Sequence, residues 1–410
     1  MTSSLPDALK PYYGGFLNAA ISPIALDFGY CGRCVYCFSD LAGQSRVNFN
    51  QAMSLISDFK NRDTLTASLL KQGYPIAISG TSDPFTPQYS KVSLPFLEVL
   101  CDLGIRFELI TKGGEAAYTA LEMLPWKIHW YISLAIFNED LRERIEPLAP
   151  TIKERLDLIE AIASRGHVVS VGISPIMADW LPGNDAENLV AELKARGVNG
   201  IRAQKMHLSP KQLKNMPAAH RAKVTDIEIA KAKQGYRYPE QEEMYQRVRN
   251  AVLDAGIHFI DSQIKERSGF FEAIQALYPQ HFPVMQDFVN WCYDTKEDEN
   301  IFTWEEYRDF FVPKLPTGKH PVHDYIYARS LASTNKVIFA RHKQTFEALL
   351  KTLWQNPQVT ISPCNTECFA IAGEVHDEGY VQFVDDDNMP FLVFDRSGYP
   401  EAVTNCVKVA

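Results

Sequence analysis

The first two thirds of this 410-residue chain alternate short apolar runs with amphipathic stretches, and this alternation restricts the fold more than any other feature. The apolar runs predict strands at 24–28, 76–79, 106–110, 129–136, 168–173 and 200–203. Helical periodicity predicts helices between them at 50–60, 90–103, 115–124, 152–165 and 185–196. Strand–helix–strand repeats build a parallel sheet, and their spacing alone fits both a barrel and an open doubly wound sheet.

Glycines mark the ends of several predicted helices. Gly104, Gly166 and Gly197 each follow a helical pattern, which is a common position for a glycine that terminates a helix. A further helical stretch ended by Gly256 leads to an apolar run at 257–261. That run predicts one more strand at the edge of the same domain.

The pattern changes beyond about residue 262. The stretch up to 355 is helical and aromatic, and Thr303 with Glu306 has the spacing of a capping box. Two alternating runs at 380–384 and 390–394 flank a polar turn, which predicts a small antiparallel β unit. We therefore expect three parts: an α/β domain over 1–261, a helical extension over 262–355 and a β unit over 356–410.

The composition is that of an ordinary globular protein, with 46% apolar and 22% charged residues. A net charge of −9 creates no global attraction to nucleic acid or to anionic membranes. The N-terminus lacks the basic and apolar regions of a secretory signal, and no run of about 18 apolar residues predicts a membrane span. These features predict a cytoplasmic protein without membrane partners.

Three of the eight cysteines, Cys31, Cys34 and Cys37, occupy one segment directly after the first predicted strand, here called the cysteine loop (residues 31–37). A C-x2-C-x2-C run places three thiolates around one iron–sulfur cubane, and Gly29 and Gly32 allow the backbone to curl around it. Three thiolates leave one iron open, as a catalytic centre requires. The alternatives are a zinc site, for which the following thirty residues supply no cysteine or histidine, and buried structural cysteines.

Motifs after the cysteine loop occur in the same order in a known family. They are Ser79-Gly-Thr-Ser-Asp-Pro, Ile110-Thr-Lys-Gly, Arg144-Ile-Glu-Pro-Leu-Ala-Pro, Glu154-Arg-Leu and Gly172-Ile-Ser-Pro. With Tyr36 just before the last cysteine, residues 14–205 resemble the radical S-adenosylmethionine superfamily, and within it the spore photoproduct lyase-like branch. One departure is clear: the superfamily's loop is C-x3-C-x2-C, and Tyr30 stands where its first cysteine is expected.

The resemblance implies a partial (β/α)6 barrel of the TIM type and a [4Fe–4S] cluster on Cys31, Cys34 and Cys37. It implies that S-adenosylmethionine binds the open iron. A donor such as flavodoxin or ferredoxin would reduce the cluster, and the reduced cluster would cleave S-adenosylmethionine. The resulting 5′-deoxyadenosyl radical would abstract hydrogen from the substrate. The resemblance also assigns residues to the S-adenosylmethionine site: Tyr36, Phe38, Ser79, Gly80, Thr81, Ser82, Asp83, Lys112, Ser133 and Arg155.

Several of these residues also have an ordinary structural interpretation. Tyr36 is expected against adenine, or else as a core aromatic. Asp83 would receive the amino group of the methionine, although it also suits an Asp-Pro turn. Lys112 or Arg155 would pair with the methionine carboxylate by charge-assisted hydrogen bonds. For Arg155 the alternative is a solvated charge on the helix surface.

The substrate is predicted by analogy alone. Spore photoproduct lyases carry a hydrogen-donating cysteine at the position of Gly80, so repair of spore photoproduct itself is not expected. The family favours a nucleobase or nucleotide, in DNA or RNA modification, and radical modification or rearrangement of a peptide or small amine is the alternative. A non-enzymatic iron–sulfur or zinc module, which would have a fourth protein ligand, is the alternative from another class.

Two further groups of residues have open interpretations. Cys364 and Cys368, with Cys292 or Cys406, would hold a second metal or stand as reduced thiols in the β unit. A basic stretch would track phosphates or form a solvated helical face; it contains Lys205, Lys211, Lys214, Arg221, Lys223, Lys231 and Lys233.

Overall fold

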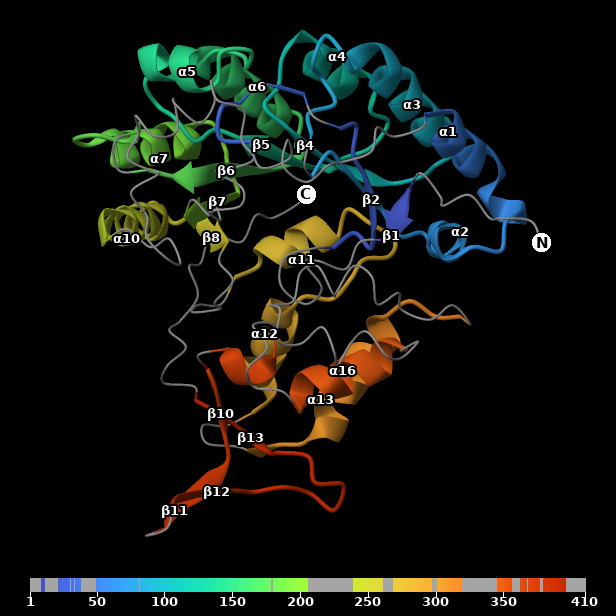
Figure 1. The fold of residues 1–410 in the computed structure, drawn as a ribbon, viewed down its shortest axis with the longest axis vertical. Coiled ribbons are helices and arrows are strands. Elements are labelled where there is room, and N and C mark those ends of the chain that lie inside the picture. Colours follow the sequence, from blue (N-terminus) through green and yellow to red (C-terminus); the bar gives the residue numbers. More distant parts are fainter. Residues whose placement is uncertain are drawn as a thin grey trace.

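The computed structural model describes residues 9–11, 21–29, 31–32, 34–37, 49–80, 82–177, 180–205, 239–260, 268–296, 301–318, 345–355, 362–366, 368–376 and 379–395. Its largest element is an eight-stranded sheet whose strands follow one another in chain order (Figure 1). The first strand, β1 (Lys10–Pro11), is antiparallel to its neighbour. Seven parallel strands follow: β2 (Ile24–Leu26), β3 (Ile76–Ile78), β4 (Phe107–Thr111), β5 (His129–Ser133), β6 (Val168–Ile176), β7 (Gly200–Lys205) and β8 (His258–Ile260).

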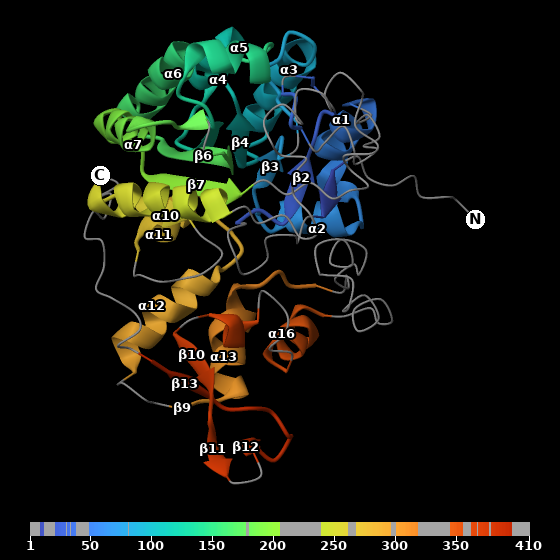
Figure 2. The same cartoon turned by 60° about the vertical axis from the view of Figure 1, so that its left-hand side comes forward.

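Helices cover the convex side of this sheet, along an arc that Figures 1 and 2 show from two directions. Because strand order equals chain order, every crossover advances the sheet in the same direction, whereas a doubly wound sheet reverses direction once. The predicted partial barrel is therefore confirmed, with seven parallel strands because the run at 257–261 contributes β8. The helices are α1 (Phe49–Asp58), α2 (Leu65–Lys71), α3 (Ser90–Asp102), α4 (Glu115–Met123), α5 (Glu139–Ile145), α6 (Ile152–Ser164), α7 (Asp185–Ala195) and α10 (Pro239–Asp254), with the 3₁₀ turn η2 (Phe59–Asn61) after α1.

The glycines predicted to end helices do so. Gly104, Gly166, Gly197 and Gly256 have φ values of +70° to +81°, the left-handed conformation that a glycine adopts without steric cost. Two short helices, α2 and α5, were not predicted, because each contains only seven residues and therefore carries little periodic signal.

The strands present different side chains to their two sides. On the convex side, Leu109 and Val171 pack against the helices and are fully buried. The alternate residues face the concave side and include polar groups: His129 Nδ1 lies 3.0 Å from Glu108 Oε2, and His129 Nε2 lies 2.7 Å from Ser170 Oγ. These paired side chains lie in the amino-terminal halves of β4, β5 and β6, which leaves the carboxyl ends for a site.

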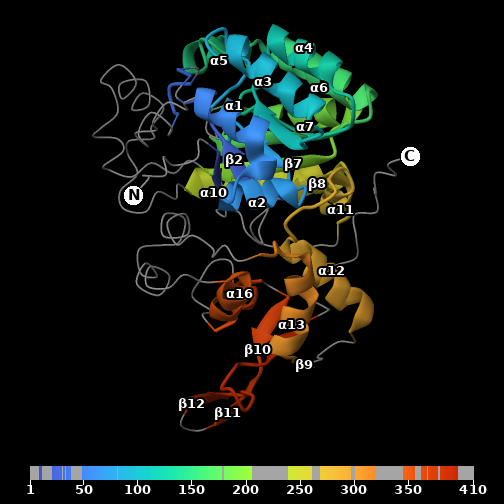
Figure 3. The ribbon, with the colours of Figure 1, turned by 90° about the vertical axis from the view of Figure 1, so that its right-hand side faces the viewer.

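The part of the chain after β8 lies beside the barrel, and its β11–β12 hairpin is the most distant element (Figure 3). The capping box predicted at Thr303 and Glu306 is present at the start of α13. Val384 and Pro390 form an antiparallel bridge around the predicted turn. The elements are α11 (Phe270–Gln275), α12 (Met285–Thr295), β9 (Ile301–Phe302), α13 (Trp304–Phe311), η5 (Val312–Lys314), α16 (Phe346–Trp354), η7 (Pro363–Asn365), β10 (Phe369–Ile371), β11 (Gly373–His376), β12 (Gly379–Gln382) and β13 (Leu392–Phe394).

The two predicted C-terminal parts share a sheet. β9 belongs to the predicted helical extension, yet it pairs with β13 of the predicted β unit in the order β10-β13-β9. The three domain boundaries themselves stay a prediction. Across the described ranges, no helix combines the length and apolar character that crossing a lipid bilayer requires.

Candidate functional site

The cysteine loop leaves the carboxyl end of β2 and turns back toward α5. Gly29 and Gly32 have φ values of +98° and +71°, so the backbone bends where residues with a Cβ would be strained. The Val35 amide donates a hydrogen bond of 3.0 Å to the carbonyl of Ile145, the last residue of α5. This contact joins the cysteine loop to the segment that follows β5.

The three thiols of the cysteine loop suit an iron–sulfur cluster in their chemistry. Cys31, Cys34 and Cys37 are free thiols, and soft thiolate donors are the usual ligands of such clusters. Burial raises the pKa of Cys34 and the Lys112 ammonium opposes this, while the charges of Glu146, Cys37 and Cys31 raise it further. Within the described ranges, no three cysteine, histidine or carboxylate side chains are already gathered as around an ion.

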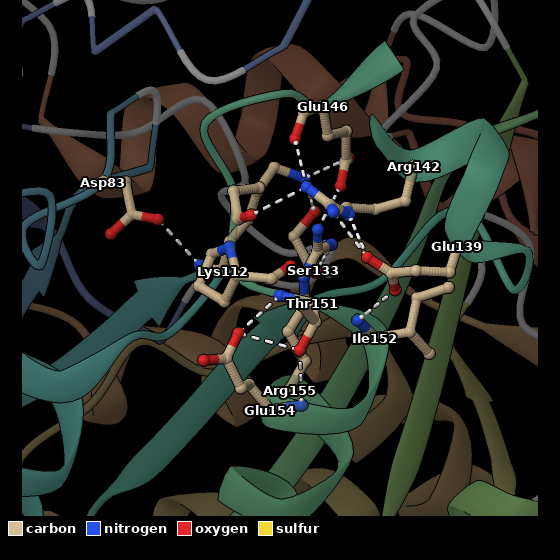
Figure 4. A network of polar contacts seen from close by, with 12 residues as sticks. Asp83, Lys112, Ser133, Glu139, Arg142, Glu146, Thr151, Ile152, Glu154 and Arg155 are labelled. Carbon is tan, nitrogen blue, oxygen red and sulfur yellow. Dashed lines mark hydrogen bonds and ion pairs between the residues drawn. The ribbon is translucent and has the colours of Figure 1, made fainter. Parts of the chain in front are cut away.

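Beside this loop lies a buried network of charges centred on Glu146 (Figure 4). Lys112 Nζ lies 2.7 Å from Glu146 Oε1, and Arg155 Nη2 lies 2.5 Å from Glu146 Oε2. Lys112 Nζ also donates to Ser133 Oγ at 2.8 Å, and Arg155 Nη1 donates to the Ser133 carbonyl at 3.1 Å. The network thereby ties the ends of β4 and β5 to α6.

The charges in this network stabilise one another. Burial alone would raise the pKa of Glu146, but Lys112 and Arg155 outweigh it and hold that pKa at about 2. Burial alone would lower the pKa of Lys112, but Cys34 and Glu146 raise it above its ordinary value. The network therefore favours the carboxylate form of Glu146 and the ammonium form of Lys112.

The Ser79–Asp83 segment closes the carboxyl end of β3. Ser79 is fully buried with φ +71°, and Ser82 Oγ accepts the Phe28 amide at 2.8 Å. The Asp83 carboxylate accepts the Lys112 amide at 2.9 Å and the Phe85 amide at 3.1 Å. The second bond is that of an Asp turn, so the turn interpretation of Asp83 is confirmed; its role toward methionine stays a prediction.

Tyr36 connects the cysteine loop to the network. Its hydroxyl donates to Glu146 Oε1 and accepts a hydrogen bond of 3.2 Å from Lys112 Nζ. Its ring lies 5.3 Å from that of Trp180. The ring is therefore packed and oriented by a buried contact, at the place where the resemblance puts an adenine-binding aromatic.

The structure brings Tyr36, Lys112, Ser133 and Arg155 together, with Ser79, Ser82 and Asp83 at the neighbouring strand end. The alternative of a solvated Arg155 is wrong, because its side chain is fully buried. Gly80 is exposed, and a Cβ built on it would have no atom within 4 Å. Phe38 and Thr81 lie outside the described residues.

Sequence reasoning missed the residue at the centre of the network. Glu146 lies inside the Arg144–Pro150 motif but was not assigned a role. Its signal was an acidic residue followed by proline within an otherwise apolar and basic segment. Arg142 supports the same segment, since its Nη1 donates to the Ala149 carbonyl at 3.2 Å and it pairs with Glu139 at 2.5 Å (Figure 4).

The other two candidate groups gain little support. Cys292 and Cys368 are fully buried, Cys364 is half-buried, and Cys406 lies outside the described residues. Burial is the main reason why the pKa of Cys292 is raised. In the basic stretch, Lys205 forms an ion pair with Glu242, and the other six residues lie outside the described ranges.

Comparison with known proteins places these features in context. The chain matches no protein-family model. It is 27% identical over 146 residues to an uncharacterised protein of Acidianus two-tailed virus, covering 33% of this chain and 47% of the viral protein. It is 24% identical over 213 residues to an uncharacterised protein of Mycobacterium tuberculosis, covering 47% of this chain and 61% of that protein. Each match thus spans less than two thirds of the relative.

Two solved structures resemble this chain at low identity. Spore photoproduct lyase complexed with dinucleoside spore photoproduct is 16% identical with a TM-score of 0.42, covering 58% of this chain and 76% of that one. Streptococcus suis SuiB bound to S-adenosylmethionine is 14% identical with a TM-score of 0.40, covering 57% and 49%. The resemblance to the spore photoproduct lyase-like radical S-adenosylmethionine branch stays a prediction from the motifs of this chain.

Proposed function

We propose that this chain is a radical S-adenosylmethionine enzyme whose cluster is held by Cys31, Cys34 and Cys37. The observation that carries the proposal is the position of the three free thiols. The loop that carries them follows the carboxyl end of a barrel strand. It lies beside a buried lysine–glutamate–arginine network at the ends of the neighbouring strands. Carboxyl ends of parallel strands are where barrels bind ligands and carry out chemistry.

The group that this site would hold supplies reductive cleavage of S-adenosylmethionine, and the chain supplies position and exclusion of water. Tyr36 is held by Glu146 and Lys112, so its ring offers a fixed apolar surface for adenine. Lys112 is the better candidate than Arg155 for the methionine carboxylate. The Lys112 side chain is 11% exposed, whereas Arg155 is fully buried and donates to Glu146 and two backbone carbonyls.

Glu146 would hold this arrangement in place. It neutralises two cations that face the cysteine loop, and its second partner anchors it to α6. A carboxylate substrate group approaching Lys112 would share the ammonium with Glu146, without leaving either cation unpaired. We assign Glu146 a positioning role for that reason.

The substrate proposed is a nucleobase or nucleotide, with a peptide or small amine as the alternative. The electron donor, of flavodoxin or ferredoxin type, and the cytoplasmic location are part of the same proposal. The alternative from another class, a non-enzymatic iron–sulfur or zinc module, would need a fourth protein ligand beside the three thiols.

The test is anaerobic reconstitution followed by reduction with dithionite in the presence of S-adenosylmethionine. The protein should bind about four irons and release 5′-deoxyadenosine, measured by chromatography. Alanine at Cys31, Cys34 or Cys37 should abolish both, while Cys101→Ala, which changes a half-buried helix thiol, should retain both. Stoichiometric zinc without charge-transfer absorption, or an intact reduced cluster that never yields 5′-deoxyadenosine, would contradict the proposal.

A further inference from the structure

The concave face of the barrel carries polar groups that the proposed chemistry does not use. Alternation along β7 places Ile201 and Ala203 against the helices and Arg202 on the concave side, because Ile201 and Ala203 are buried in the core. Arg202 is half-buried. In the part of the chain that the structure describes, its guanidinium has no hydrogen-bond or ion-pair partner.

Two hydroxyls lie on the neighbouring strands of the same face. Gly172 of β6 is in register with Arg202, and a Cβ built on Gly172 would lie 1.9 Å from the Tyr131 hydroxyl. The Tyr131 hydroxyl therefore occupies the space beside Arg202 that a larger residue at 172 would fill. Two residues further along β6, Ser174 Oγ is buried and has no hydrogen-bond partner among the described residues.

The concave face around Arg202 is poor in acidic side chains. The residues of β5, β6 and β7 that alternate with the core-facing ones contain no carboxylate. They are His129, Tyr131, Ser133, Val168, Ser170, Gly172, Ser174, Gly200, Arg202 and Gln204. Glu108 of β4, an acid on the concave side, is paired with His129 toward the amino ends of the strands. A half-buried guanidinium with no acidic partner among the described residues, near the Tyr131 hydroxyl and one strand away from the unpaired Ser174 hydroxyl, favours binding of an oxyanion. The chain as a whole has a net charge of −9, so this preference is local.

We propose that Arg202, with the hydroxyls of Tyr131 and Ser174, binds an oxyanion of the substrate, either a phosphate or a carboxylate, on the concave face of β5–β7. Describing the ligand as the substrate rests on the proposed function. The binding itself needs neither the cluster nor S-adenosylmethionine, since all three residues belong to barrel strands. Lys112 lies at the end of β4 and Glu146 lies after α5. The proposed anion site and the site beside the cysteine loop would therefore bind different parts of the bound molecules.

The test is isothermal titration of the full chain, without cluster reconstitution, with two matched pairs of probes. Thymidine 5′-monophosphate and thymidine differ only in the phosphate, while hippurate and its amide differ only in the carboxylate. One charged probe should bind about tenfold or more tightly than its neutral partner. Arg202→Gln should remove that preference and Arg202→Lys should retain part of it, because lysine keeps the charge without the bidentate geometry. Arg165→Gln, an exposed arginine on the helical side, is the matched control.

Thermal unfolding of each variant shows whether it is folded, and Tyr131→Phe provides a milder change if Arg202→Gln unfolds. A preference for the phosphate or for the carboxylate identifies the oxyanion, and either result supports the inference when it depends on Arg202. Equal binding of charged and neutral probes, or a preference unchanged in Arg202→Gln, would overturn it. If the protein shows this preference but releases no 5′-deoxyadenosine, the result supports the anion site and contradicts the proposed function.

Discussion

Replacing Glu146 by glutamine should destabilise the barrel more than any surface substitution of a carboxylate. Glutamine keeps the size of the side chain and removes the charge that neutralises Lys112 and Arg155. Those two side chains are 11% and 0% exposed, so water cannot take over the role of the carboxylate. Removing one partner of a buried ion pair typically costs about 3–5 kcal/mol, because the other charge stays buried without compensation.

The lowered pKa of Glu146 gives a similar value for the contribution of its charge to stability. Its fall from the ordinary 4.5 to about 2 in the folded protein corresponds to about 3 kcal/mol of stability. Because the folded pKa is the lower one, this contribution is fully present above pH 4.5. It is lost as the pH falls through about 2, and below that value the carboxylate is protonated in both the folded and the unfolded chain.

The assay is urea unfolding of the wild type and Glu146→Gln, followed by tryptophan fluorescence at pH 7 and at several acidic values. We expect a difference of about 3–5 kcal/mol in the free energy of unfolding at pH 7 that shrinks below pH 4.5. Glu143→Gln is the control, since its side chain is 68% exposed and should change stability by less than about 0.5 kcal/mol. A Glu146→Gln variant within about 1 kcal/mol of the wild type at pH 7, or a difference that persists in acid, would refute the reasoning.

Three further predictions concern glycines: two concern Gly80 and one concerns Gly172. Gly80→Cys should fold as the wild type does, because a Cβ there meets no atom within 4 Å, and thermal unfolding checks this. The unmodified protein, which lacks a thiol at Gly80, should release no thymines from dinucleotide spore photoproduct in a chromatographic assay; multiple-turnover repair would show that the hydrogen donor lies elsewhere. Gly172→Ala should destabilise the chain by about 1–3 kcal/mol through overpacking against Tyr131, and an unchanged melting temperature would mean that the ring moves aside freely.

The strands and helices of the barrel could be predicted because hydrophobic periodicity and helix-ending glycines depend on residues that are close in the sequence. The strand at 76–79 and the helix at 90–103 differ from β3 and α3 by one residue each at their ends. Glycine at 104 has the left-handed conformation that its position after a helical pattern requires. The strand at 129–136 was predicted too long, since β5 ends at Ser133 although the apolar run continues. Burial continues beyond Ser133 through Leu134 and Ala135, and burial alone does not distinguish a strand from a packed loop.

Side-chain partners could not be predicted in the same way. Arg155 next to Glu154 fits an exposed helix surface as well as a buried ion pair, and only its position against Glu146 decides between them. The contacts of side chains on the concave face could not be predicted either. Polar residues such as Arg202 alternate with apolar ones along β7, and the sequence does not show which groups of the neighbouring strands lie beside them.

The amino-acid sequence by itself determined the order of strands and helices, the position of the cysteine loop after the first parallel strand, and the helix ends, because hydrophobic period and backbone freedom act between near neighbours. Only the tertiary structure decided that the strands form a partial barrel, that Lys112 and Arg155 share Glu146, and that Tyr131 lies over Gly172 beside Arg202. Charge pairing and close packing depend on distances through space. Those distances are set by which strands become neighbours, and the spacing along the chain does not contain them.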